Sequence, residues 1–190
     1  MLNSPDDPFI VETRAWVERV VIGLKLCPFA PAPALKGLIR YATSEVETPE
    51  ALLEDLATEL QHLVASPPEE VETTLLVHPQ VLQDFHDFND FLEIADEALR
   101  IWGLEGEIQI ASFHPDYQFG GTEPDDAENY TNRSPYPILH LLREESLDRV
   151  LESTEHAEQI PIRNIKLMNS MGSKELSALL KACLDRAEPD

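Results

Sequence analysis

Helical and strand-like hydrophobic patterns alternate along the first two thirds of this 190-residue chain, and this alternation restricts the fold more than any other feature. Apolar residues recur at helical spacing in three segments, at residues 9–24, 52–63 and 82–99. Short runs of the kind that fill strands separate and follow them, at residues 38–43, 73–77 and 107–113. Helices and strands in alternation favour crossover connections. We therefore predict an α/β fold with a small parallel or mixed sheet built from β-α-β units with flanking helices.

The secondary structure of the last third of the chain is harder to predict from the sequence. The apolar run at residues 138–142 is too short for periodicity to separate a strand from the start of a helix. Residues 147–151 look helical, and two further helices are predicted, the first ending at Gly172 and the second beginning at Ser173. Neither a repeat nor a linker interrupts the sequence. Residues 1–190 are therefore predicted to form a single compact domain with a helical C-terminus.

The charge balance argues against several classes of partner. Asp and Glu number 36 against 14 Lys and Arg, which gives a formal charge of -22. Such a surface repels phosphate backbones and anionic lipid headgroups, so we expect neither nucleic-acid nor membrane binding, although a local basic pocket can still hold a small anion. The N-terminus lacks the basic start and apolar core of a signal peptide. A cytoplasmic protein with two free thiols, Cys27 and Cys183, is expected.

We predict that the loop at residues 112–143 carries the function, because it gathers His, Asp, Glu, Asn, Arg and Tyr in one polar stretch. Loops of this length are usually functional or disordered. Its aromatic residues argue against disorder, since segments that stay unfolded are poor in aromatic side chains. We interpret it as an ordered functional loop, with a structural Ω-loop as the alternative.

Two predicted strands end in the same dipeptide, His-Pro, at His78 and at His114. Ligands of open α/β sheets bind outside the carboxyl ends of the strands, so both imidazoles are candidate catalytic groups that share one site if the strands are neighbours. Asp116 is close enough to His114 to orient it for proton transfer or to hold a divalent cation with it. No H-E-x-x-H spacing is present, so both metal and cofactor stay unknown. The alternative is that each histidine only makes structural hydrogen bonds.

Cys27 is a second candidate, as a nucleophile whose pKa a nearby histidine lowers. Pro28 ends the predicted helix here, which leaves the thiol more accessible than in mid-helix. Against this, the partial negative charge of a helix C-terminus disfavours a thiolate, and Cys27 is equally explained as a small apolar residue that closes the helix. Cys183 and His140, both among apolar neighbours, are predicted to be core residues, His140 with one nitrogen satisfied.

Four further residues are candidates for substrate binding: Arg40, Asn129, Arg133 and Arg143. Arginine grips carboxylates and phosphates with two parallel hydrogen bonds, which suits an anionic ligand. For Arg40, a buried ion pair with an acidic residue is the alternative.

Three segments carry a resemblance to a known family: WVERVVIGLKLCPFA near the start, GLIRYATS after it, and FHPDYQFGGTEPDDAENYTNRSPYPILHLLRE in the second half. With these, nearly the whole chain resembles a bacterial family catalogued as a domain of unknown function (DUF1415-like). The resemblance implies a compact cytoplasmic domain and carries no catalytic assignment.

Two functions from different classes follow. The first is a small enzyme, a hydrolase or transferase acting on a polar or anionic small molecule, with His114, Asp116 and His78 or a Cys27 nucleophile. The second is a binding or regulatory module without turnover, in which Tyr117, Tyr130 and Tyr136 contact a metabolite or a protein. The sequence leaves the substrate and the oligomeric state open.

Overall fold

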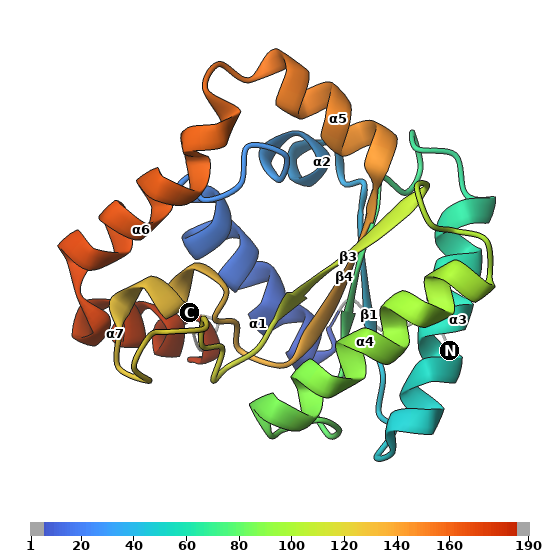
Figure 1. The fold of residues 1–190 in the computed structure, drawn as a ribbon, viewed down its shortest axis with the longest axis horizontal. Coiled ribbons are helices and arrows are strands. Elements are labelled where there is room, and N and C mark those ends of the chain that lie inside the picture. The colour runs from blue at the N-terminus through green and yellow to red at the C-terminus, as the bar shows by residue number, and fades with distance from the viewer. Residues whose placement is uncertain (1–5, 186–190) are drawn as a thin grey trace.

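A mixed four-stranded sheet lies at the centre of the protein, with helices on both of its faces (Figure 1). The computed structural model describes residues 6–185. Residues 1–5 and 186–190 of the predicted domain lie outside the described residues, and so does the start of the N-terminal segment in which a signal peptide was sought. The strand order is β1-β2-β4-β3. The bounds are Ile39–Thr43 for β1, Thr73–Val77 for β2, Ile108–Phe113 for β3 and Ile138–Arg143 for β4.

The predicted α/β class and mixed sheet are confirmed. β1 and β2 are parallel, whereas β4 is antiparallel to both of its neighbours, β2 and β3. The ambiguous run at residues 138–142 is therefore a strand, and it lies between the two strands that end in His-Pro. β2 and β3 consequently run in the same direction without being neighbours, so the condition stated for a site shared by His78 and His114, that their strands are adjacent, is not met.

One face of the sheet is covered by α3 (Pro49–Ala65) and α4 (Phe85–Ile101). Leucines at four positions of α3 and apolar residues of α4 form a core there with the side chains of β2 and β4 that point to this face. Asp84 caps the N-terminus of α4, where its carboxylate accepts from the backbone N–H of His86 at 2.8 Å. The helix predicted from the apolar pattern at residues 82–99 therefore begins later, at Phe85, because Leu82 takes a left-handed conformation with φ 57°.

The opposite face is covered by the N-terminal and C-terminal helices (Figure 1). The N-terminal helix begins as α1 (Pro8–Trp16) and continues as a π-helical stretch at Val17–Ile22. The C-terminal region comprises α5 (Glu144–Ser153), a 3₁₀ turn at Ala157–Gln159, α6 (Ile160–Met171) and α7 (Ser173–Leu184). Trp16, Met168 and Leu176 pack from these helices onto the sheet. The two predicted C-terminal helices are thus confirmed on either side of Gly172.

Two further short helical segments, α2 and a 3₁₀ turn, lie outside the helices that hydrophobic periodicity predicted. The Pro-rich segment contains α2 (Pro31–Lys36), whose prolines lie in the first turn, where a missing N–H costs nothing. Ala127–Thr131 of the long loop forms a 3₁₀ turn. Among residues 6–185, no helix is both long and apolar enough to cross a membrane.

Candidate functional site

His78 and His114 meet on the α3/α4 side of the sheet. Each follows the last residue of a strand, β2 or β3, and both side chains are fully buried. Both rings pack against Phe88 of α4, with ring centroids 5.7 Å and 5.1 Å from that of Phe88. The two strands are separated by β4, but they run in the same direction. The His-Pro dipeptides that follow them therefore place both imidazoles at the same edge and on the same face of the sheet.

Hydrogen bonds to the backbone occupy most of the nitrogens of these two rings. His78 Nδ1 donates to Val81 O over 3.1 Å, and His114 Nε2 donates to Leu82 O over 3.1 Å. His114 Nδ1 accepts from the backbone N–H of Asp116 at 3.0 Å, so His114 is the neutral Nε2–H tautomer. Burial lowers the pKa of His78 to about 4 and also lowers the pKa of His114. The two rings therefore fasten the turn that leads into α4.

Two of the candidate arginines are engaged within the fold. Arg40 on β1 forms a bidentate ion pair with Glu59 of α3, at 2.6 Å and 2.9 Å, which matches the alternative stated for it. Arg143, at the end of β4, donates through Nη2 to three backbone carbonyls over 2.6, 2.7 and 3.0 Å, those of Leu63, Ser66 and Val71. These bonds satisfy the carbonyls where α3 ends and the chain turns toward β2.

Asn129 and Arg133 hold the long loop in shape. The fully buried amide of Asn129 accepts from the Phe119 N–H at 3.0 Å and from Thr122 Oγ1 at 2.8 Å, and it donates to Glu123 O over 2.8 Å. Arg133 donates to Tyr117 O and Pro124 O over 3.2 Å and 2.7 Å and stacks over the ring of Tyr130. The side chains that sequence analysis assigned to substrate binding thus make the internal contacts of a folded loop.

We expect Asn129→Ala to lower the free energy of unfolding by about 2–4 kcal/mol, because it removes the three hydrogen bonds of a fully buried amide, to the Phe119 N–H, the Thr122 hydroxyl and the Glu123 carbonyl. Urea denaturation at pH 7 measures this loss. The matched control is Asn89→Ala, at an exposed position of α4, for which the change should stay within about 0.5 kcal/mol. Equal effects of the two substitutions would contradict the structural role of Asn129.

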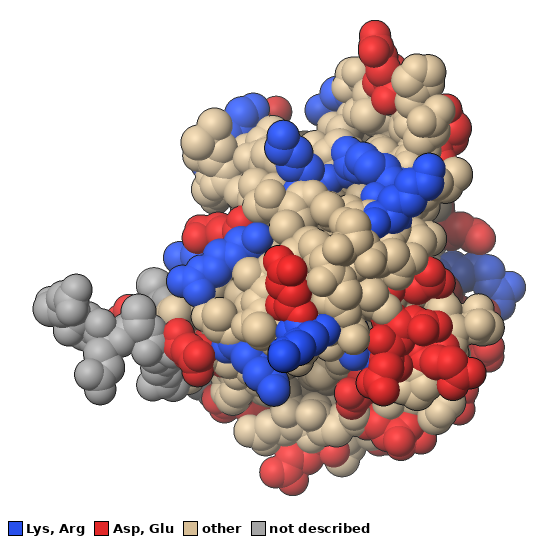
Figure 2. All heavy atoms as spheres, turned by 90° about the vertical axis from the view of Figure 1, so that its left-hand side faces the viewer, with Lys and Arg blue, Asp and Glu red and all other residues tan. Residues whose placement is uncertain are grey.

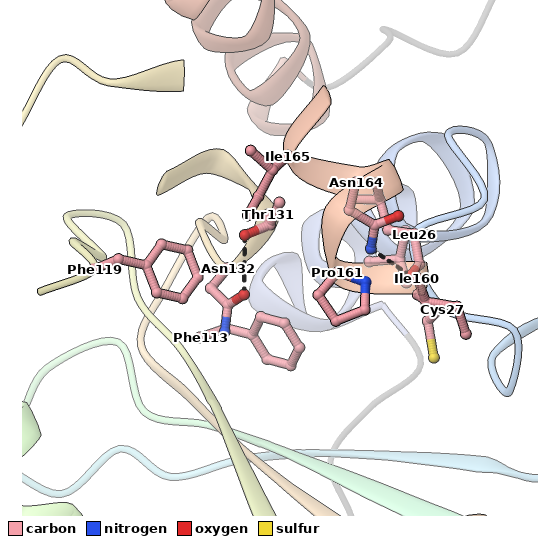
Figure 3. Close-up of a pocket in the computed structure, with 11 residues that line it drawn as sticks. Leu26, Cys27, Phe113, Phe119, Thr131, Asn132, Ile160, Pro161, Asn164 and Ile165 are labelled. Atoms are coloured by element: carbon pink, nitrogen blue, oxygen red, sulfur yellow. Dashed lines mark hydrogen bonds between the residues drawn. The ribbon is translucent and has the colours of Figure 1, made fainter. Parts of the chain in front are cut away.

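A cavity of about 380 Å³ lies on the other side of the sheet, between the loop, the N-terminal helical segment and α6 (Figure 3). Its walls are mainly apolar. Figure 3 shows Phe119 and Asn132 of the loop facing Pro161 and Ile160 of α6 across the cavity, with Cys27 beside Ile160. We call this space the outer chamber. The residues that line it are Val21, Leu26, Cys27, Phe113, Phe119, Thr131, Asn132, Ile160, Pro161, Asn164 and Ile165.

Hydrogen bonds fix the polar groups of this wall. Asn164 Nδ2 donates to Leu26 O over 2.8 Å and so ties α6 to the residue before Cys27. Thr131 Oγ1 donates to Asn132 Oδ1 over 3.2 Å, and Asn132 Nδ2 donates to Ser112 O over 3.4 Å. The seam between α6 and the N-terminal segment is also bridged by Arg163, which donates to Lys25 O. The outer chamber therefore has walls from three segments that are distant in sequence.

A second, smaller cavity of about 50 Å³ adjoins the first and shares Val21, Cys27 and Phe113 with it. We call it the inner chamber. Further walls come from Trp16, Val17, Phe29, Ala30, Ile39, Thr73, Leu75 and His140. Cys27 thus lies where the two chambers meet, and His140 of β4 lies in the wall of the inner one.

His140 is held in one tautomer by Thr73. Thr73 Oγ1 donates its proton to Leu141 O over 2.6 Å, so it can only accept from His140 Nε2, which lies 2.8 Å away. The proton of the neutral ring is therefore on Nε2, and Nδ1 carries a lone pair. Burial lowers the pKa of His140 to about 4. The prediction of one satisfied nitrogen is confirmed, and the position of the ring beside the inner chamber is new.

The Cys27 thiol is affected by two opposed influences. Burial raises its pKa, whereas the backbone N–H groups of Ala30 and Phe29 approach the sulfur and lower it. Burial is the larger influence, so the thiol is protonated in the resting protein. Cys183, by contrast, lies on α7 and is buried in the hydrophobic core of the protein, where its Sγ donates to Leu179 O over 3.3 Å.

Sequence analysis missed Thr73, Asn132 and Asn164 and set His140 aside. One signal was present: His140 shares a strand face with apolar Ile138 and Leu142, and Asn164 lies on the inward stripe of α6 with Met168. A polar residue on a buried face needs a partner or a function. A polar residue on a buried face can thus be recognised in the sequence as a candidate site residue, but the sequence does not show which of these residues lie close together.

Charge is distributed unevenly around these chambers. Helix α6 has two basic residues, Arg163 and Lys166, and no acidic one, whereas α3 has four acidic residues and neither Lys nor Arg. Figure 2 views the side of the molecule that carries α6 and α7: Lys and Arg are spread over its upper, left and central parts with some Asp and Glu among them, and Asp and Glu gather most densely at its lower right. The wall formed by α6 is therefore locally basic in a strongly acidic protein.

Comparisons with known proteins identify a family but no activity. A family model described as a protein of unknown function, DUF1415, matches residues 9–178. Neither a curated protein nor a solved structure matches the chain. Within residues 6–185, no group of three or more His, Cys, Asp or Glu side chains is arranged to hold a metal ion.

Proposed function

This chain belongs to the DUF1415 family of unknown function, and we propose that it is a thiol-dependent hydrolase or transferase that acts on the acyl group of a small molecule, with Cys27 as nucleophile. The observation that carries the proposal is the position of Cys27 at the junction of two chambers, with His140 in the wall of the inner one. A nucleophile, a base and a third group that orients the base are the parts that covalent catalysis needs. Thr73 is the orienting group.

The chemistry proceeds in two steps. Cys27 Sγ attacks the acyl carbon while its proton passes to His140 Nδ1, either directly or through a water molecule. The bond to the leaving group then breaks, and the leaving atom takes the proton from His140. In the second step, water or an acceptor molecule attacks the thioester, the carbon–sulfur bond breaks, and the proton returns to Cys27.

The resting protonation states suit this sequence. The buried thiol is protonated and His140 is neutral, so the proton transfer that makes a thiolate starts from the correct pair of states. The N–H groups of Phe29 and Ala30 stabilise negative charge on the sulfur as it forms. A base with so low a pKa is weak, but its conjugate acid is strong and readily protonates a leaving group.

The acyl group of the proposed substrate is apolar, and an anionic substituent on it adds affinity. The apolar walls of the outer chamber suit this acyl group. Arg163 donates to Lys25 O and to Asn164 Oδ1 at 3.0 Å, which places a guanidinium on the seam beside the chamber. A carboxylate or phosphate of the ligand finds its counter-charge there.

His114 with Asp116 is the rival site for the same class of reaction. Asp116 meets His114 through its backbone N–H rather than through its carboxylate, and both ring nitrogens of His114 already have partners. The rival therefore needs a rearrangement of the turn before either nitrogen can exchange a proton with a substrate. At the Cys27 site, His140 Nε2 is bonded to Thr73, and its Nδ1 carries the lone pair that takes the proton in this proposal.

The alternative from a different class is a binding module without turnover. The apolar walls of the outer chamber and the raised pKa of Cys27 favour it, because both suit a ligand that is held and not attacked. The tyrosine-rich loop supports it less. Tyr117 packs against Phe85 and Phe119, and Tyr130 lies under Arg133, so these rings are used within the fold.

Covalent acylation separates the two classes. On incubation with the S-methyl thioester of phenylacetic acid, intact-mass and peptide analysis should detect a phenylacetyl group on Cys27 and none on Cys183, since Cys183 is buried in the core. Free methanethiol should accumulate beyond one equivalent if the thioester turns over. Absence of both the adduct and turnover would contradict the enzyme and leave the binding module.

A further inference from the structure

The two chambers that meet at Cys27 differ greatly in size, and the proton donor lies in the smaller one. Among the described residues that line the inner chamber, Cys27 and His140 are those with ionisable side chains. The residues that line the outer chamber include Cys27 but not His140. Cys27 is thus shared by the chambers, whereas His140 belongs to one of them.

A general acid has to reach the leaving atom at hydrogen-bond distance, about 2.6–3.2 Å between heavy atoms. In the proposed reaction that acid is His140. The leaving atom therefore has to lie on the inner side of the sulfur, and the acyl group then extends into the outer chamber. The position of His140 fixes the direction in which the reacting bond lies.

The volumes limit the size of each part. An apolar cavity of about 150 Å³ holds a benzene molecule, which has six heavy atoms. The inner chamber, at about 50 Å³, has a third of that volume and so accommodates two or three heavy atoms. The outer chamber, at about 380 Å³, accommodates an aromatic ring with substituents.

The inner chamber is also difficult to enlarge. Trp16, Val17 and Leu75 in its wall are 2%, 4% and 3% exposed. Leu75 lies on β2, which is paired on both sides by β1 and β4. Packed interiors of this kind do not yield to an oversized group without loss of stability. The limit on size therefore also applies to the bound state.

We propose that the substrate has a small leaving group, of two or three heavy atoms at most, on an apolar acyl group: a primary carboxamide, which releases ammonia, or a methyl ester or thioester. This inference rests on the proposed function. For the carboxamide, the carbon–nitrogen bond breaks, the nitrogen takes the proton that His140 received from Cys27, and water then releases the carboxylic acid and restores the thiol.

The test compares two probes with the same acyl group, the S-methyl and the S-benzyl thioesters of phenylacetic acid. Benzyl thiolate is the better leaving group in solution, so chemistry alone favours the S-benzyl ester. We expect the protein to prefer the S-methyl ester by at least about tenfold in kcat/KM, because the benzyl group does not fit the inner chamber.

Substitutions in the walls of the two chambers test whether the inner chamber causes the preference for the S-methyl thioester. Val17→Ala enlarges the inner chamber and should reduce the preference by about fivefold or more, in favour of the S-benzyl ester. Ile39→Ala, in the same wall but at the edge strand β1, serves if Val17→Ala does not fold. The matched control is Ile165→Ala, which widens the outer chamber and should leave the ratio of the two probes unchanged.

The outcomes are distinct. Hydrolysis of both probes with equal efficiency, or a ratio that Ile165→Ala changes and Val17→Ala does not, overturns the inference and leaves the thiol enzyme standing. Failure to hydrolyse either probe or to acylate Cys27 overturns the proposed function and the inference with it. A preference for the S-methyl ester that Val17→Ala relaxes supports both.

Discussion

Replacing Cys27 with serine is expected to lower kcat/KM for the S-methyl thioester by at least about 1,000-fold. A serine hydroxyl has a far higher pKa than a thiol, and His140, whose own pKa burial lowers to about 4, is too weak a base to activate it. The backbone N–H groups of Phe29 and Ala30 approach the side-chain atom in either case, so the substitution changes the nucleophile and little else. Steady-state release of methanethiol measures the effect.

Three controls make this result specific. Cys183→Ala removes the other thiol, which lies in the core of α7, and should leave kcat/KM within about twofold. His140→Gln should lower kcat more than KM, because it removes the proton carrier and leaves the outer chamber intact. His114→Gln should leave both constants largely unchanged. Activity that survives in Cys27→Ser but is lost in His114→Gln would transfer the site to the rival pair.

Acidification from pH 7 to pH 4 is expected to destabilise the protein by about 3 kcal/mol through His78 alone. In the unfolded chain this imidazole takes up a proton near pH 6.5, whereas in the folded protein burial keeps its pKa at about 4. Between these two values the unfolded chain binds more protons, so the free energy of unfolding falls as the pH falls. The pKa of His140 is lowered to about 4 by burial as well, and its effect has the same sign in the same range.

Urea denaturation at several pH values between 7.5 and 4.5 measures this slope. His78→Phe keeps a ring against Phe88 but cannot titrate, so its stability should depend less steeply on pH below 6.5. The matched control is His86→Gln, at an exposed position of α4, which should retain the wild-type slope. An identical slope in His78→Phe and the wild type would show that His78 takes up its proton in both states at the same pH.

The elements that were predicted well are those whose signal is local. The leucines of α3 recur on one face, and the run at Thr73–Val77 is apolar throughout, so periodicity alone identifies the helix and the buried strand. The start of α4 was placed too early because Val81 and Leu82 continue its apolar pattern, although Leu82 is left-handed and Asp84 is the cap. The apolar pattern does not show that Leu82 has a positive φ angle, which keeps this residue out of the helix.

The candidate site was predicted only in part, for a topological reason. The His-Pro repeat correctly brought His78 and His114 to one edge, because two strands that run in the same direction end at the same edge. The strand that separates them, β4, comes last along the chain, and its run at residues 138–142 carried no signal of direction or partner. With β4 inside the sheet, between β2 and β3, His140 comes to face the N-terminal helical segment.

The sequence by itself determined the α/β class, the helix and strand segments with strong periodicity, the acidic surface and the choice of Cys27 as a reactive candidate. These depend on interactions between residues close in the chain, or on composition. Only the tertiary structure decided that the arginines and Asn129 make hydrogen bonds within the fold, and that Cys27 lines the same small cavity as His140 rather than lying near His114. The position of Cys27 relative to His140 depends on which face of β4 His140 occupies and which segment covers that face, and both are set by the packing of segments more than 100 residues apart.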